Sequence, residues 1–248
     1  MLPRLLRVAL LFVAIAAGTG SALAQQSEQY RFSWRLRGAL AWIARIAFPT
    51  SGVGELKNVQ KEGNLLDSQL LITARNASEG HYLYRSEIDQ TAERTMTSYH
   101  GYAWGGKFRK ERTRFDYANR IAHIREEEAD EIENRQKALP GIAMRDVLTG
   151  IHYLRQNAEK IDAPLRTNIY SDGKMYPVVF KPGERSSYDF DGQKIPARTF
   201  TITTAPGSKK RWPGGIRVWL SDDARHIPLR IDIKRGMASL QLDLESIG

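Results

Sequence analysis

The stretch YRFSWRLR, residues 30–37, alternates large apolar side chains with polar ones at every second position. A period of two places the apolar side chains on one face of an extended chain and the cations on the other, so this stretch predicts a half-buried β-strand. Similar strand-like runs occur at 54–60, 68–76, 81–89, 95–104, 107–115, 121–127, 167–170, 175–180, 195–204, 216–221, 227–234 and 238–244. Gly, Pro, Asn and Asp separate many of them, as expected for hairpin turns. The sequence therefore predicts a mainly β fold: a curved antiparallel sheet, or a partly open β-barrel or sandwich.

One segment has the spacing of a helix. Between Ala143 and Ala158 the apolar residues recur three to five positions apart, which predicts one amphipathic α-helix near 143–158, packed on the sheet. The acidic run Glu126–Glu133 lacks the Gly and the alternating oxygen ligands of a calcium loop, so we expect a solvated face there. Pro182–Gly183 is expected to form a turn between two strands.

The first 24 residues have the order of a cleavable secretory signal. Arg4 and Arg7 precede the apolar run Val8–Ala17, and small residues follow at 22–24. The apolar run is too short to span a bilayer, and no Cys follows it to carry a lipid anchor. We therefore expect cleavage after residue 24, a periplasmic location, and a single mature β domain over residues 25–248.

The composition limits the class of partner. Among 248 residues there are 37 Lys and Arg against 28 Asp and Glu, and 42% of the chain is hydrophobic, which is typical of a globular protein rather than a disordered one. In an exported protein this basic surplus favours an anionic or amphipathic envelope ligand, with contact to the membrane surface, over nucleic acid. The sequence leaves the oligomeric state open.

No cofactor or metal is predicted. The chain has no Cys, so disulfides, thiolate metal sites and a Cys nucleophile are excluded, and its five His lack the short spacings of a zinc site. Gly101–Lys107 fits the glycine spacing of a phosphate loop, but Phe108 stands where Ser or Thr would bind magnesium. No Gly-x-Ser-x-Gly elbow of a hydrolase is present.

Three residues are weak catalytic candidates: Asp222, Asp223 and His152. Neighbouring carboxyl groups can divide the roles of acid and base when their environments differ. The segment Asp222–His226 is, however, also typical of a hairpin loop in which Asp accepts hydrogen bonds from turn amides. A lone His on a helix is more often structural than a ligand. Enzymatic activity is therefore uncertain, and we favour a protein without it.

Aromatic and basic residues are the candidates for ligand binding. The concave face of an open sheet is where apolar ligands bind in such folds, and the basic cluster at 107–114 can steer an anion, although core packing and ordinary solubilising charge are the alternatives. Trp42 lies in the apolar run 38–48, which ends before Pro49 and is a candidate flap or membrane-touching surface. The candidates are Trp34, Trp42, Arg112, Arg114, Tyr153, Arg155 and Trp219.

Two segments carry a family resemblance. DVLTGIHYLR at 146–155, together with VWLSDD at 218–223 and IPLR at 227–230, resembles the exported bacterial family catalogued as domain of unknown function (DUF) 3108. Ile169–Lys174 and Phe115–Asp116 match in the same order, so the resemblance covers most of residues 30–244. It implies a curved, mostly antiparallel sheet with a helix packed in its middle region. It brings no established activity, cofactor or catalytic residue.

Together these features favour a non-enzymatic periplasmic protein of the cell envelope. Its curved sheet would bind a lipid, a lipid-linked glycan or a partner polypeptide. One alternative is a hydrolase of an envelope glycan or ester. Another is a structural interaction module that pairs with a second protein through an exposed sheet edge.

Overall fold

The computed structural model describes residues 27–38, 50–75, 80–104, 106–140, 142–171, 173–212, 214–235 and 238–248. Its helical elements are η1 (Glu62–Asn64), α2 (Val147–Asn157) and η3 (Ala158–Lys160). Its strands are β1 (Ser27–Gly38), β2 (Ser51–Gln60), β3 (Leu65–Ala74), β4 (His81–Asp89), β5 (Arg94–Trp104), β6 (Lys107–Asp116), β7 (Ile121–Glu128), β8 (Glu131–Ala138), β9 (Leu165–Ser171), β10 (Lys174–Phe190), β11 (Gln193–Thr204), β12 (Gly215–Ser221), β13 (Pro228–Arg235) and β14 (Ala238–Ile247).

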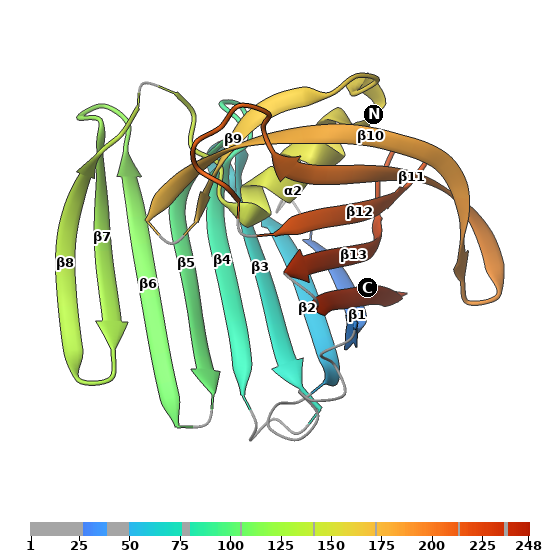
Figure 1. Cartoon of the computed structure of the whole chain (residues 1–248), viewed down its shortest axis with the longest axis horizontal. Coiled ribbons are helices and arrows are strands. Elements are labelled where there is room, and N and C mark those ends of the chain that lie inside the picture. The colour runs from blue at the N-terminus through green and yellow to red at the C-terminus, as the bar shows by residue number, and fades with distance from the viewer. Residues whose placement is uncertain are drawn as a thin grey trace, which may run out of the picture.

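The strands form one curved antiparallel sheet (Figure 1). Its order is β8-β7-β6-β5-β4-β3-β2-β1-β14-β13-β12-β11-β10-β9, so β1 to β8 and β9 to β14 are two meanders joined where β1 pairs with β14. The sheet is not closed, because β8 and β9 are its two ends. The helix α2 lies inside the curve and contacts β3, β4 and β9. The predicted mainly β fold with one packed helix is confirmed.

The strand predicted from residues 30–37 is β1. Tyr30, Phe32 and Trp34 point into the core that the helix shares with both meanders, while the intervening cations lie on the outer face. The indole N–H of Trp34 donates to the carbonyl oxygen of Thr73 at 2.7 Å. The indole fits because Gly52, which lies opposite in β2, has no side chain.

The helix starts later than the sequence predicts. Residues 143–146 are not helical, because their backbone groups bond to strands: the carbonyl of Met144 accepts from Thr95 at 2.8 Å and that of Arg145 from Tyr170 at 2.6 Å. Asp146 is the N-cap, and its carboxylate accepts from the backbone N–H of Thr149 at 2.8 Å. Sheet contacts therefore set the first turn of α2.

The acidic run is solvated over residues 128–133, as predicted, and only Glu126 at its start turns inward, where it pairs with Arg109 and Arg135. One turn prediction is corrected. Pro182–Gly183 is not a turn, because β10 runs through it with a shift in its register against β11. A Pro has no N–H to give to the ladder, and an irregularity of this kind accommodates it.

The C-terminal part of α2 is anchored by Arg155. Its guanidinium donates to the Glu28 carboxylate at 3.0 Å and to the Tyr30 hydroxyl at 3.0 Å, both in β1. It also donates to the carbonyl oxygens of His226 at 3.0 Å and Arg225 at 3.1 Å, in the β12–β13 turn. One buried side chain therefore joins the helix to both meanders.

Among the described residues no helix has the length and apolar character needed to cross a membrane.

The first prediction concerns Gly52. A Cβ atom there would lie 1.9 Å from the carbonyl oxygen of Thr73 and 2.5 Å from Nε1 of Trp34, so Gly52→Ala should lower the free energy of unfolding by about 1–3 kcal/mol. Urea denaturation measures this change in the free energy of unfolding. Gly215→Ala is the matched control, because a Cβ atom at Gly215 meets nothing within 4 Å. Equal stability of the two variants would contradict the proposed packing of Trp34.

The second prediction concerns Arg155. Arg155→Met should lower the free energy of unfolding by about 2–4 kcal/mol, because it leaves the groups that Arg155 binds without their donor. Arg185→Met, which removes an ion pair of 3.0 Å with Asp222 between more exposed side chains, should cost less than about 1 kcal/mol. The same urea titration compares them, and a loss in the Arg155 variant no larger than in the control would exclude the anchoring role.

Candidate functional site

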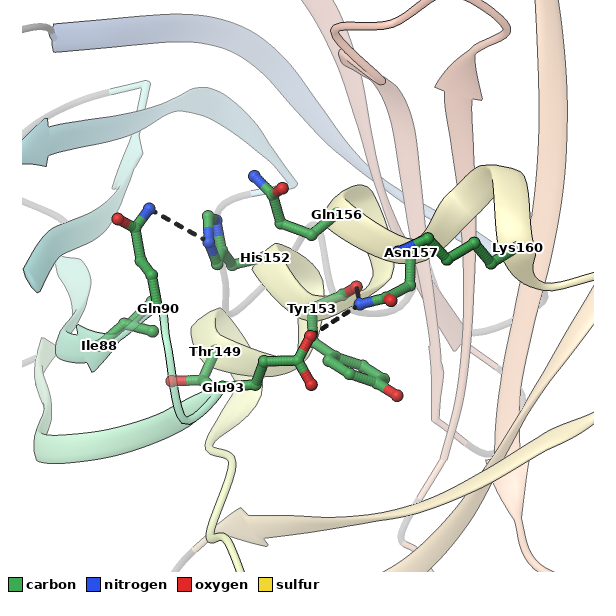
Figure 2. Close-up of a pocket in the computed structure, with 9 residues that line it drawn as sticks. All are labelled: Ile88, Gln90, Glu93, Thr149, His152, Tyr153, Gln156, Asn157 and Lys160. Carbon is green, nitrogen blue, oxygen red and sulfur yellow. Dashed lines mark hydrogen bonds between the residues drawn. The ribbon is translucent and has the colours of Figure 1, made fainter. Parts of the chain in front are cut away.

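A polar cleft runs along α2 on the side that faces β3 and β4. It consists of two neighbouring cavities of about 320 and 200 Å³ that share Gln90, His152 and Gln156. The larger cavity also has Glu93, Tyr153 and Asn157 in its wall (Figure 2). The smaller one extends toward Asn58 and Arg155. We refer to the two cavities together as the α2 cleft.

Helical spacing brings the α2 residues of the cleft together. His152 and Gln156 are four residues apart, as are Tyr153 and Asn157, so each pair lies one turn apart on adjacent parts of one helix face. Gln90 comes from the turn between β4 and β5, where its backbone N–H donates to the carbonyl of Asn64 at 3.1 Å. The cleft therefore forms where the β4–β5 turn meets the middle of the helix.

Polar side chains of the sheet lie at one end of the cleft. Glu28, Asn58 and Ser68 are cross-strand neighbours on the inner face of β1, β2 and β3. The amide of Asn58 donates to the Glu28 carboxylate at 3.2 Å, and the Ser68 hydroxyl donates to the amide oxygen of Asn58 at 2.8 Å. These bonds fix the orientation of the Asn58 amide within the smaller cavity.

His152 is the central side chain of the cleft. Its Nε2 lies 3.5 Å from Nε2 of Gln90, and its buried Nδ1 has no hydrogen-bond partner in the described part of the chain (Figure 2). Burial, helped by the charge of Arg155, lowers the pKa of His152 to about 4. The imidazole is therefore neutral at pH 7 and has one N–H donor and one nitrogen acceptor. Because Nδ1 is buried away from solvent, its unpaired state is a cost to the fold and not a contact offered to a ligand.

Most charged groups near the cleft are already paired; the exception is Lys160, an exposed cation in the wall of the larger cavity that has no ion pair within the described residues. The Glu93 carboxylate accepts from the Asn157 amide at 3.1 Å and from the Arg145 guanidinium at 3.4 Å. Arg145 also lies 4.1 Å from the centre of the Tyr153 ring. The groups left to meet a ligand are mostly amides and the neutral imidazole.

The catalytic candidates occupy two places. Asp222 pairs with Arg185 at 3.0 Å. Asp223 accepts from the Ser221 hydroxyl at 2.8 Å and the backbone N–H of Arg225 at 3.0 Å; burial opposes these bonds, but they lower the pKa of Asp223 below its usual value. Both lie in the turn between β12 and β13, as expected for the hairpin loop predicted at Asp222–His226. No contact within the described residues joins either carboxylate to His152.

The aromatic candidates are dispersed. Trp34 is in the core, with its N–H bonded to Thr73. Trp219 points to the outer face of β12, where Arg217 and Arg230 lie 5.7 and 5.6 Å from its ring. Trp42 and the expected signal peptide lie outside the described residues, so the predictions made for them stay predictions.

The remaining candidates fall into two groups. Tyr153 and Arg155 join His152 at the α2 cleft, although Arg155 is engaged by the contacts that anchor the helix. Arg112 and Arg114 lie on the outer face of β6, beside a shallow hollow of about 510 Å³. The predicted ligand-binding residues therefore do not form one site.

The amide side chains of Gln90, Gln156 and Asn157 were not among the binding residues predicted from the sequence. The spacing of Gln156 from His152 was a signal for a shared helix face. Gln90 lies 62 residues before His152 in the chain, and no local pattern connects the two.

Comparison with known proteins gives a family and a fold. A family model described as "Protein of unknown function (DUF3108)" matches residues 29–245. The crystal structure of a β-barrel-like protein of domain of unknown function DUF1849 from Brucella abortus is similar, with a TM-score of 0.58 and 10% sequence identity over 90% of this chain and 97% of that one. The Mycobacterium tuberculosis lipoprotein LppX aligns with a TM-score of only 0.28 and 14% identity, over 88% and 84% of the two chains. No curated protein matches the sequence.

The third prediction concerns the titration of His152. The pKa of His152 is about 4 in the folded protein, against 6.5 for an unperturbed histidine. Below pH 6.5 the unfolded chain therefore binds a proton that the folded protein does not, and stability falls as pH falls. His152→Leu should remove this loss. Between about pH 7 and about pH 4.5, the free energy of unfolding should fall by about 2 kcal/mol less in the variant than in the wild type. Urea titrations at both pH values measure it, and an unchanged pH dependence would exclude a buried neutral imidazole.

Proposed function

Because the chain belongs to the family described as protein of unknown function DUF3108, we propose its function from the site: it is a non-enzymatic binding protein of the periplasm. Its α2 cleft holds the hydroxyl-rich part of an envelope ligand, such as a glycan or the glycan of a lipid-linked glycan. The order of charged, apolar and small residues at 1–24 supports the periplasmic location.

The chemistry of the cleft wall carries this proposal. The side chains of Gln90, Gln156 and Asn157 each have donors and an acceptor, and neutral His152 has one of each. A sugar hydroxyl also donates and accepts, so it can be bound by such groups without a change in charge. A lipid tail would cover the amides of Gln90 and Gln156 without hydrogen-bonding to them, which costs free energy, whereas the amide of Asn157 already donates to Glu93. The cleft therefore suits a polar, uncharged group.

The cleft supports binding better than hydrolysis. A hydrolase needs a nucleophile or acid held within hydrogen-bonding distance of its base. In the described structure the partner of His152 is an amide, and the nearby carboxylate of Glu93 is paired with Asn157 and Arg145. This pairing supports a role for Glu93 in shaping the cleft.

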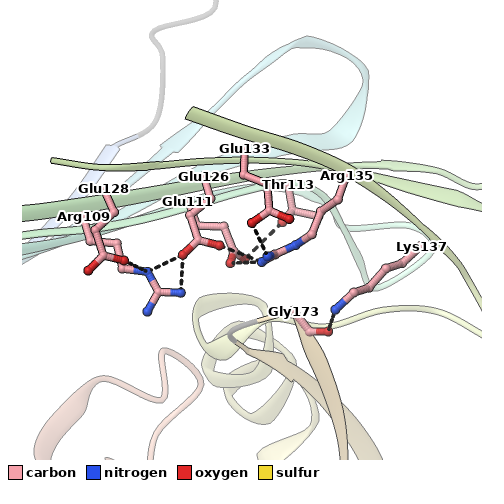
Figure 3. Close-up of polar contacts among 9 residues, drawn as sticks. All are labelled: Arg109, Glu111, Thr113, Glu126, Glu128, Glu133, Arg135, Lys137 and Gly173. Carbon is pink, nitrogen blue, oxygen red and sulfur yellow. Dashed lines mark hydrogen bonds and ion pairs between the residues drawn. The ribbon is translucent and has the colours of Figure 1, made fainter. Parts of the chain in front are cut away.

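The edge-pairing alternative has weaker support. β8 is an end strand of the sheet, and along its inner side it carries Glu133, Arg135 and Lys137 (Figure 3). Charged residues on an edge strand that point inward are a common way to prevent pairing with another chain. The Lys137 ammonium also donates to the carbonyl of Gly173 at 2.8 Å, which ties this edge to the β9–β10 turn.

The fourth prediction tests ligand binding in the cleft. Oligosaccharides released from a Gram-negative envelope by mild acid should give saturation-transfer NMR signals with the wild-type protein. The double variant Gln90→Leu, Gln156→Leu loses about two hydrogen-bonding side chains and should bind about ten-fold more weakly or worse. The matched control is Gln193→Leu, which changes an exposed glutamine at the start of β11.

The outcome decides between the alternatives. Equal signals from the double variant and the control would place binding outside the cleft. Signals from the acyl chains of extracted lipid, with none from sugar protons, would favour a lipid carrier. Turnover of the oligosaccharides that is lost in His152→Leu would show a hydrolase.

A further inference from the structure

The strands β6 and β7 have two chemically different faces. Along β6, Glu111, Thr113 and Phe115 are buried, whereas Arg112 and Arg114 are exposed. The alternation continues in β7, where Ala122 and Ile124 are buried and Arg125 is exposed. The side of β6 to β8 that faces away from the helix is what we call the outer basic face, and it carries Phe108, Lys110, Arg112, Arg114, Asp116, Arg125, Glu127 and Ile132.

Strand register places like charges next to one another on this face. Arg112 lies directly opposite Arg125, and Arg114 lies opposite His123. Like charges in directly opposed positions destabilise a sheet. Arg112 and Arg114 form no ion pair or hydrogen bond within the described residues, and Arg125 bonds only to Glu127 of its own strand, at 3.0 Å. Hydrogen bonds from Asn119, together with the nearby charge of Arg114, lower the pKa of Asp116, so Arg114 is partly compensated. Arg112 faces Arg125 without an ion pair of its own, and this arrangement points to an external anion.

The acids of the same strands are used on the opposite face. Glu111 and Glu126 point inward and surround the guanidinium of Arg135, at 3.3 and 2.8 Å (Figure 3). Glu126 also accepts from Arg109 at 2.6 Å. Glu111 and Glu126 therefore neutralise cations on the inner face and do not neutralise the arginines on the outer face. On the outer face, Glu127 lies between Lys110 and Arg125.

Apolar side chains border the basic residues. Phe108 is 37% exposed and Ile132 is 58% exposed, which makes Ile132 the most exposed large apolar residue among those described. Register aligns Ile132 with Glu127 and Lys110 across the three strands, and Phe108 precedes Lys110 by two residues on the same face. The basic residues and the two apolar residues therefore form one continuous surface. Cations that meet phosphates beside apolar groups that enter the acyl boundary are the pattern of a surface that binds membranes.

We propose that the outer basic face docks on an anionic phospholipid membrane, with Arg112, Arg114 and Arg125 at the lipid phosphates and Phe108 and Ile132 at the acyl boundary. The face is open to solvent, and its exposed apolar groups would stay in water if the partner were a free phosphate. This inference does not depend on the ligand of the α2 cleft, because the two sites share no residue.

The experiment is co-sedimentation with lipid vesicles. The protein is expressed from its full-length gene and purified in the form that the cell retains. It should bind vesicles of equal parts phosphatidylcholine and phosphatidylglycerol, and not vesicles of phosphatidylcholine alone. Arg112→Gln, Arg125→Gln should weaken binding at least about ten-fold, since each cation near such a surface contributes roughly five-fold. Its melting temperature should not fall, because the change removes two opposed like charges.

A matched control separates this face from general charge. Lys209→Gln, Lys210→Gln removes the same charge from an exposed loop and should leave binding within about two-fold of wild type, because these cations do not face the membrane. Ile132→Ser should weaken binding with no change in charge. The proposal is overturned if the control loses as much as the arginine variant, or if the arginine variant binds like wild type. It is also overturned if polyglutamate or inorganic phosphate displaces the protein at the charge concentration of the vesicles.

Discussion

The fold depends on one buried guanidinium inside an open sheet. The two meanders pair with each other at β1 and β14, but the end strands β8 and β9 share no ladder of hydrogen bonds, so the helix inside the curve must be fastened to both meanders by side chains. Arg155 does this from the helix, because its partners are Glu28 and Tyr30 in the first strand and two carbonyls in the β12–β13 turn. A buried cation is stable only when it is paired, so each partner is constrained to remain in place. The position of α2 follows from that constraint.

The other end of α2 is held by a buried carboxyl group. Asp146 caps the helix, its carboxylate accepts from the Ser86 hydroxyl of β4, and its backbone N–H donates to the Thr95 hydroxyl oxygen at 2.9 Å. Burial raises the pKa of Asp146, and the hydrogen bonds from Ser86 and Thr149 oppose that rise. With both ends fixed, the middle of the helix stands over the β4–β5 turn, and the α2 cleft is the space between them. The rigidity of this frame is why the cleft is suited to hold a ligand in one orientation.

The two proposed sites use opposite sides of the sheet. The α2 cleft lies on the inner side and presents amides and a neutral imidazole. The outer basic face lies on β6 to β8 and presents cations beside apolar groups. A protein of this design could stay at a membrane while it holds the polar part of an envelope ligand. The sequence has more basic than acidic residues, and the acids Glu111 and Glu126 pair with a cation on the inner face. The basic surplus is therefore available on the outer face.

The sequence by itself determined the strands and their faces. Alternation alone places Tyr30, Phe32 and Trp34 in the core, and it places Arg112 and Arg114 on one face of β6, because the side-chain period of a strand is fixed by its backbone. It did not reveal β8, where charged residues occupy the inner face and Asn134 and Gln136 the outer one, so that no apolar alternation marks the strand. It also did not set the start of α2, since Met144 and Arg145 give their carbonyls to β5 and β9. Only the tertiary structure brought Gln90 to His152 and Arg125 opposite Arg112, because contacts across a sheet depend on register and on turns, which local sequence does not encode.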